Sequence, residues 1–178
     1  MRYEPNISDH VICPDRYWES GHIVVLGLGN ILLSDEGVGV HAVHAIKRQY
    51  NFQPEINLVD GGTMGLDLLP LFQNGERILI IDAVDFKKSP GYVGVMEGDA
   101  IPSALNAKLS AHHIGLSDLL FTAKLMRSTP PEICLIGIQP KSLQLGLDMT
   151  QEIGAQMDSI ISLAVQKLAR WGIVCSLR

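Results

Sequence analysis

Three short polar clusters stand out in a chain whose remaining pattern is largely apolar. They are Ser34-Asp35-Glu36, Ile81-Asp82-Ala83 and Ala111-His112-His113. Each cluster follows a run typical of a strand or begins a run typical of a helix. In open α/β sheets, functional groups gather where strands end and the next helices start. Two carboxylates and an imidazole at such an edge could hold a divalent metal ion, so the sequence predicts a metal or catalytic site there.

Asp82 is the candidate that is hardest to explain as purely structural. It follows four apolar residues, 78–81, and is followed by two more. A carboxylate at the end of a central strand must be paired, bound to a ligand or in reach of solvent. The competing interpretation is a cap on a neighbouring helix. Asp85 is expected in the next loop, where it would be solvated.

Asp35 and Glu36 are expected in the first turn of a helix, where acidic side chains gain about 0.3–1 kcal/mol from the helix dipole. One residue is enough for that role, and Asp35 is the better cap. Glu36 would then be able to point outwards, which makes it the candidate functional carboxylate of this pair.

The histidines allow structural as well as functional interpretations. His112 and His113 precede an amphipathic helix, and His113 could simply cap it. His41 and His44 lie one helical turn apart, but no third metal ligand is near them in sequence. A solvated helix face is therefore the better account of His41 and His44.

A glycine-containing segment, Asp60-Gly61-Gly62-Thr63, ends the second expected strand. Two glycines permit positive φ angles and close approach by the backbone of a partner. The segment could be a turn closed by an Asx-type hydrogen bond, or a loop that contacts a bound peptide. The residues alone leave both interpretations open.

The elements that must position these groups alternate between strands and helices. Strands are expected over 22–28, 56–59, 77–84, 92–96 and 132–138, and helices over 37–50, 63–72, 114–126 and from Thr150 onwards. This order predicts an α/β three-layer sandwich, with a mostly parallel sheet of about five strands, one antiparallel edge strand and helices on both faces. The segment 92–96 is expected to pair with 77–84 as a hairpin. Residues 1–21 are interpreted as a tail, and 22–178 as a single α/β domain.

Composition argues against several classes of protein. The net charge is -5 and no basic patch is evident, which argues against nucleic-acid binding. No run approaches the ~18 apolar residues needed to span a bilayer, so no membrane association is expected. Three widely spaced cysteines without a CxxC pair suggest a reducing compartment, and hence a cytoplasmic protein.

Several common catalytic and binding motifs are absent or incomplete. The chain has no GxSxG and no HExxH motif, so serine hydrolase and zincin chemistry is unsupported. Gly27-Leu28-Gly29 begins like a dinucleotide fingerprint, but Leu32 stands where the third glycine belongs. A nucleotide-binding α/β protein is therefore a weak alternative.

Five stretches together resemble the nickel-iron hydrogenase maturation endopeptidases. They are 25–39, Asp60–Thr63, Ile81–Ala83, Ser110–Leu116 and Gly137–Pro140, and they occur in the family's order over about 23–173. The resemblance implies a protease that removes a short carboxy-terminal extension from the hydrogenase large-subunit precursor after nickel has entered it. The partner would be that precursor.

The resemblance also implies roles for particular residues. The family's metal ligands map onto Glu36, Asp82 and His112, and Asp60 maps onto a segment implicated in substrate discrimination. Asp60 is in addition a candidate base, so the expected catalytic set is Glu36, Asp82, His112 and Asp60. Nickel is expected to arrive with the substrate, and no permanently bound cofactor is expected.

Two questions stay open on the sequence. The nickel could only mark the cleavage point, or it could also polarise the scissile carbonyl or activate a water molecule. A non-catalytic nickel-binding assembly factor would use the same three ligands and leave the length of the precursor unchanged.

Overall fold

A computed structural model describes residues 23–101 and 113–178 of the chain. The tail expected over 1–21, together with Cys13 and His112, lies outside the described residues. Within the described ranges, no helix is long and apolar enough to cross a lipid bilayer.

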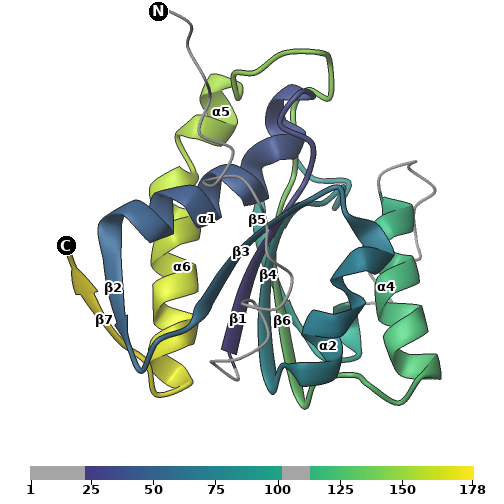
Figure 1. Ribbon diagram of the computed structural model, residues 1–178. Coiled ribbons are helices and arrows are strands. Elements are labelled where there is room, and N and C mark those ends of the chain that lie inside the picture. Colours follow the sequence, from purple (N-terminus) through teal and green to yellow (C-terminus); the bar gives the residue numbers. More distant parts are fainter. Residues whose placement is uncertain (1–22, 102–112) are drawn as a thin grey trace, which may run out of the picture.

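A five-stranded sheet in the order β3-β1-β4-β6-β5 forms the centre of the molecule (Figure 1). The four strands β3, β1, β4 and β6 are parallel, and β5 is antiparallel to β6 at one edge. The bounds are β1 Ile23–Leu28, β3 Asn57–Gly62, β4 Arg77–Ala83, β5 Val93–Glu97 and β6 Glu132–Ile138. The predicted fold class is confirmed.

Helices cover both faces of this sheet (Figure 1). Helices α1 and α6 lie on one face, and α2 and α4 lie on the other. The bounds are η3 Ser34–Gly37, α1 Val38–Gln49, η4 Gly65–Leu68, α2 Leu69–Asn74, α4 His113–Leu125, α5 Gln151–Gly154 and α6 Met157–Arg170. The central strands are apolar along their length because neither face meets water.

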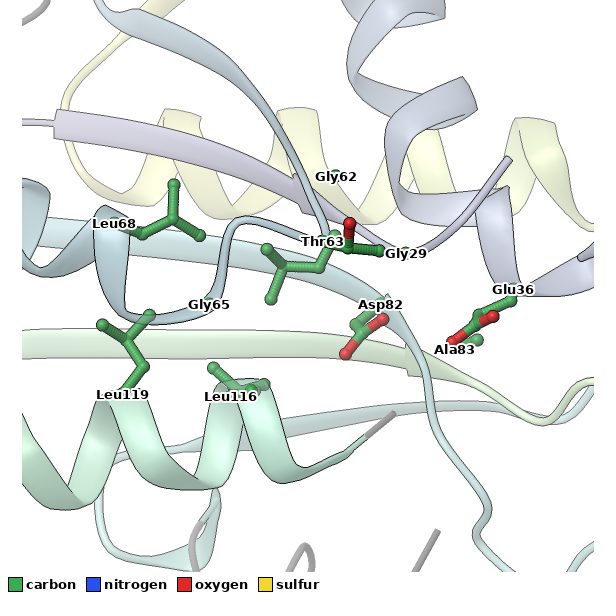
Figure 2. Close-up of a pocket in the computed structure, with 12 residues that line it drawn as sticks. Gly29, Glu36, Gly62, Thr63, Gly65, Leu68, Asp82, Ala83, Leu116 and Leu119 are labelled. Carbon is green, nitrogen blue, oxygen red and sulfur yellow. The ribbon is translucent and has the colours of Figure 1, made fainter. Parts of the chain in front are cut away.

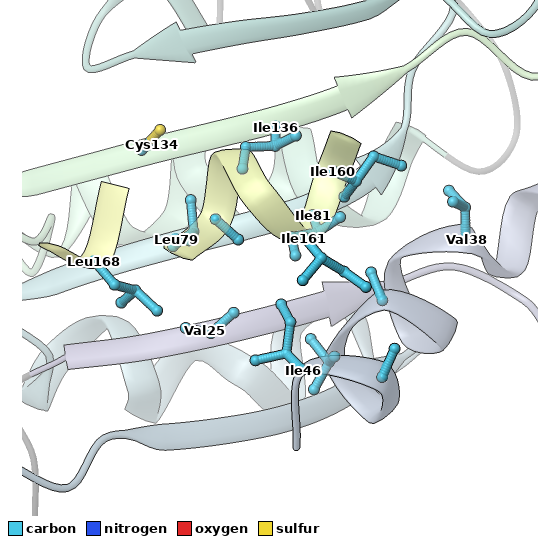
Figure 3. Close-up of a cluster of buried hydrophobic side chains, with 14 of the residues drawn as sticks. Val25, Val38, Ile46, Leu79, Ile81, Cys134, Ile136, Ile160, Ile161 and Leu168 are labelled. Atoms are coloured by element: carbon cyan, nitrogen blue, oxygen red, sulfur yellow. The ribbon is translucent and has the colours of Figure 1, made fainter. Parts of the chain in front are cut away.

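Two apolar clusters lie on opposite faces of the sheet. Side chains of β4 alternate between them: Leu79 and Ile81 pack with α1 and α6, as Figure 3 shows, whereas Ile78 and Ile80 pack with α2 and α4. Successive side chains of a strand point to opposite faces. The same alternation directs Asp82 to the face that α2 and α4 cover.

Two expectations about individual elements are wrong, and one further element was not expected. Strand β5 pairs with β6 and not with β4, because β1 and β6 already occupy both edges of β4. The long helix expected from Thr150 is divided into α5 and α6, with a turn at Ala155 and Gln156. A second, two-stranded antiparallel sheet, β2 Tyr50–Gln53 with β7 Val174–Leu177, was not anticipated.

Glycines allow α1 to lie directly against the sheet. A Cβ on Gly39 would be 2.1 Å from the carbonyl oxygen of Ile81 and 2.4 Å from that of Leu28. At Gly29 the φ angle is +122°, and a Cβ would be 1.8 Å from the carbonyl oxygen of Glu36. Larger residues at these positions would push η3 and α1 away from β1 and β4, so the glycines fix how closely Glu36 approaches the end of the sheet.

Candidate active site

A cavity of about 180 Å³ lies at the carboxyl ends of β1, β3 and β4. Figure 2 shows Glu36 and Asp82 beside it, with the first turns of α4 on the opposite side. Its wall includes Gly29, Gly62, Gly115 and Leu116 in addition to the two carboxylates. The cavity therefore occupies the edge of the sheet where the sequence placed a functional site.

Asp82 is the last polar residue of β4 and is buried. The pKa of its carboxyl group is raised from 3.8 to about 7, mainly by burial and in smaller part by the nearby Glu36 carboxylate. A hydrogen bond from the backbone N–H of Ala83 acts in the opposite direction. Asp82 can therefore hold or release a proton close to neutral pH.

Glu36 reaches the same cavity from the short helix η3 and is also buried. The expectation that Glu36 points outwards from a helix is wrong. Since η3 precedes α1 and turns the chain over the end of β1, the side chain is directed inwards, towards the side on which Asp82 lies (Figure 2). Two carboxylates that face one small cavity repel each other when both are charged, and a cation between them would relieve that repulsion.

Asp35 has a different role from the helix cap that the sequence suggested. It is fully buried, and its side chain makes no capping hydrogen bond to η3. Its carboxylate accepts hydrogen bonds from the backbone N–H groups of Lys141, Ser142 and Thr150 at 2.7–2.9 Å, and from the hydroxyl of Thr150 at 3.0 Å. Asp35 therefore holds the loop between β6 and α5 against η3. The partners lie more than 100 residues away in sequence, so no local pattern reveals them.

Asp60 lines a second pocket and not the cavity of Glu36 and Asp82. Its Oδ2 atom is 2.8 Å from Nε2 of His44, and its Oδ1 atom accepts a hydrogen bond from the backbone N–H of Gly62. The second pocket also includes His41 and Arg48 from α1. The Asx-type turn considered for this segment is therefore present, while the next residues, Gly62 and Thr63, line the first cavity.

Of the two histidines of α1, only His41 departs from the solvated face that was expected. His44 is half-exposed and hydrogen-bonded to Asp60, whereas burial lowers the pKa of the partly buried His41. Across the described residues, no three His, Cys, Asp or Glu side chains are placed to hold a metal ion together. A three-ligand metal site is therefore not formed by His41, His44 and Asp60. Of the three expected ligands, Glu36 and Asp82 line the same cavity, and His112 lies outside the described part of the chain.

The raised pKa of Asp82 predicts how stability depends on pH in metal-free protein. Between pH 4 and about 7 the folded state binds a proton at Asp82 that the unfolded state has lost, so stability falls as pH rises through this window. Asp82→Asn removes this dependence of stability on pH, because an amide does not titrate. We expect its free energy of unfolding to exceed that of the wild type by about 1–3 kcal/mol at pH 8 and by less at pH 5.

Urea denaturation with a chelator present measures this difference. Asp118→Asn, at an exposed position of α4, is the matched control and should follow the wild type at both pH values. A constant difference between Asp82→Asn and the wild type across this pH range would contradict the burial of an ionisable group at Asp82.

Comparisons with known proteins agree with this architecture. A family model described as "Hydrogenase maturation protease" matches residues 40–167. The hydrogenase expression/formation protein HupD of Rhodobacter capsulatus is 39% identical over 153 residues, which are 85% of this chain and 73% of that protein. HoxM of Cupriavidus necator, which has the same description, is 37% identical and is covered over 75% of its length.

Solved structures of hydrogenase maturation proteases resemble this chain as well. The hydrogenase maturating endopeptidase HybD from E. coli superposes with a TM-score of 0.83 at 32% identity, covering 88% of this chain and 97% of that one. The [NiFe] hydrogenase maturation protease HybD from Thermococcus kodakarensis gives a TM-score of 0.67 at 33% identity, covering 83% and 98%. The chain therefore belongs to the hydrogenase maturation protease family, and it is a peptidase.

Proposed function

We propose that this peptidase removes the carboxy-terminal extension of the nickel-loaded precursor of a nickel-iron hydrogenase large subunit, and that it recognises the substrate through its nickel. The observation that carries the proposal is the burial of two carboxylates, Glu36 and Asp82, beside one cavity at the end of the sheet. Family membership favours a protease over the non-catalytic assembly factor considered from the sequence.

The donor set suits a nickel ion that belongs to the substrate. Glu36 and Asp82 offer oxygen ligands, and we assign His112 as the nitrogen ligand because it directly follows Ser110-Ala111, the position of the ligand histidine in the family that the chain resembles. Two carboxylates and an imidazole form a set that Ni²⁺ accepts. Three ligands from the protease would leave positions for ligands of the precursor, so the metal would fix the cleavage point between the two proteins.

Protons compete with the metal at this site. Asp82 must lose its proton before it binds a cation, and its pKa is about 7. Affinity for the metal should therefore rise with pH up to about neutrality. During cleavage the same carboxyl group can accept or donate a proton at Oδ1 or Oδ2. Asp60 faces the second pocket, which makes Asp82 the better candidate for this exchange.

The substrate segment would enter along Gly62 and Thr63, which form one wall of the cavity. Gly62 has a φ angle of +43°, and a Cβ there would meet only the carboxylate of Asp60, at 3.7 Å. The backbone of an extended peptide can therefore lie close to this residue. Cys134 and Cys175 are free thiols, which fits action in the cytoplasm, a reducing compartment.

The test is to incubate the protein with nickel-loaded and with metal-free large-subunit precursor and to measure the intact mass of each. We expect the nickel-loaded precursor to lose a carboxy-terminal peptide and the metal-free precursor to keep its full mass. Equal cleavage of both forms would contradict recognition through nickel. Cleavage of neither form would contradict the assignment of the substrate.

A further inference from the structure

Five large apolar side chains are exposed next to the candidate active site. Leu143, Leu145 and Leu147 belong to the loop between β6 and α5, and Ile31 and Leu32 belong to the turn after β1. We call these five residues the apolar platform. Leu145 is 85% exposed and Leu147 is 66% exposed. Clustered exposed apolar side chains of this kind mark surfaces that bind other molecules.

Hydrogen bonds fix the two halves of the platform to each other. The backbone N–H of Gly146 donates to the carbonyl of Leu32 at 3.0 Å, and the N–H of Ser34 donates to the carbonyl of Gly146 at 2.8 Å. The Ser34 hydroxyl donates to the carbonyl of Gln144 at 3.0 Å. The buried carboxylate of Asp35 holds the two ends of the loop, at Lys141–Ser142 and at Thr150. The leucines are therefore presented by a firmly held loop.

One short helix connects the platform to the cavity. Within η3, Ser34 and Asp35 bind the loop that carries the leucines, and the next residue, Glu36, lines the cavity. Figure 1 shows the loop before α5 beside η3 at the same end of the sheet. A protein that brings a peptide to Glu36 must therefore cover the platform, or lie directly beside it.

We infer that the platform is the docking surface for the folded body of the large-subunit precursor, whose carboxy-terminal segment enters the adjacent cavity. This inference rests on the function proposed above. The precursor would offer an apolar patch next to the start of that segment. An anionic lipid surface fits poorly, because residues 143–148 contain one acidic residue and no basic one, and the chain has a net charge of -5. A second copy of this chain is the remaining alternative, and the test below includes it as an outcome.

The test compares Leu145→Ser/Leu147→Ser with Leu125→Ser. Leu125 is 74% exposed on α4, outside the platform, and is the matched control. Binding of nickel-loaded precursor is measured by stopped-flow mixing before cleavage occurs, and processing kinetics are measured with the same proteins, all of which keep Glu36 and Asp82. Thermal melts verify that all variants are folded.

We expect the double substitution to raise Kd and KM by about tenfold and to leave kcat unchanged, because docking contacts act equally before and during cleavage. Leu125→Ser should change neither constant. An unchanged Kd and KM in the double variant would overturn the docking surface. So would a fall in kcat alone, or a wild-type dimer that the double substitution dissociates while KM stays the same.

The experiment separates this inference from the proposed function. If the wild type binds the precursor through the leucines but does not cleave it, the docking surface stands and the proposed function fails. If the precursor is cleaved and the leucines do not matter, the function stands and the docking surface fails. If the wild type neither binds nor cleaves the precursor, both fail.

Discussion

Asp82→Asn and Glu36→Gln should each lower the rate of precursor processing by at least about a hundredfold, because each removes a charge aimed at the reacting centre. Both side chains are buried beside the same cavity, and the amide keeps the shape of the carboxylate. An amide binds a divalent cation weakly and cannot exchange a proton at neutral pH. Neither substitution leaves a cavity, so both variants should fold. The measurement is the first-order rate of mass loss of nickel-loaded precursor under single-turnover conditions.

Control substitutions separate this effect from a general change of charge. Asp118→Asn and Glu55→Gln remove carboxylates at exposed positions and should process at the wild-type rate. His41→Ala, in the second pocket, should also process normally. His112→Ala should lose activity as the two carboxylate variants do. Normal processing by Asp82→Asn and Glu36→Gln would remove the basis for the site assignment.

Asp35→Ala should destabilise the fold by about 3–5 kcal/mol, because it removes a buried carboxylate that accepts four hydrogen bonds. The substitution leaves the backbone N–H groups of Lys141, Ser142 and Thr150 without their acceptor. It also creates a small cavity at a fully buried position. The expected result is a large shift of the urea midpoint, with no comparable shift in Asp118→Ala.

A second consequence of Asp35→Ala follows from its position. Asp35 holds the loop that carries the three leucines of the apolar platform. The fraction of the variant that stays folded should therefore bind the precursor more weakly than the wild type. A loss of less than about 1 kcal/mol would mean that water replaces the carboxylate without cost. That result would contradict the structural role that the hydrogen bonds of Asp35 assign to it.

The parallel strands of the main sheet and the two candidate carboxylates could be predicted from the sequence, whereas the partner of β5 could not. The apolar run before Asp82 identifies a strand buried on both faces, and side-chain alternation along β4 then directs Asp82 towards α2 and α4. The residue pattern also identified Glu36 as a candidate functional carboxylate, within the cluster Ser34-Asp35-Glu36. The five motifs of the resemblance identified the family, which the comparisons confirm.

The remaining features depend on contacts between distant segments. The sequence selected Glu36 over Asp35 on the ground that Asp35 caps a helix, whereas Asp35 in fact binds the loop before α5 and Glu36 lines the cavity. The pairing of β5 depends on which sheet edge is vacant, which requires the strand order. Asp60 was grouped with the catalytic residues by sequence, yet its hydrogen bond to His44 places it in another pocket.

Anomalous X-ray scattering from crystals grown with Ni²⁺ would test most directly whether the site holds a divalent ion. The account predicts one strong peak at about 2.0–2.2 Å from carboxylate oxygens of Glu36 and Asp82 and from an imidazole nitrogen of His112. An ion bound elsewhere, for example between His44 and Asp60, with no metal between Glu36 and Asp82, would contradict it.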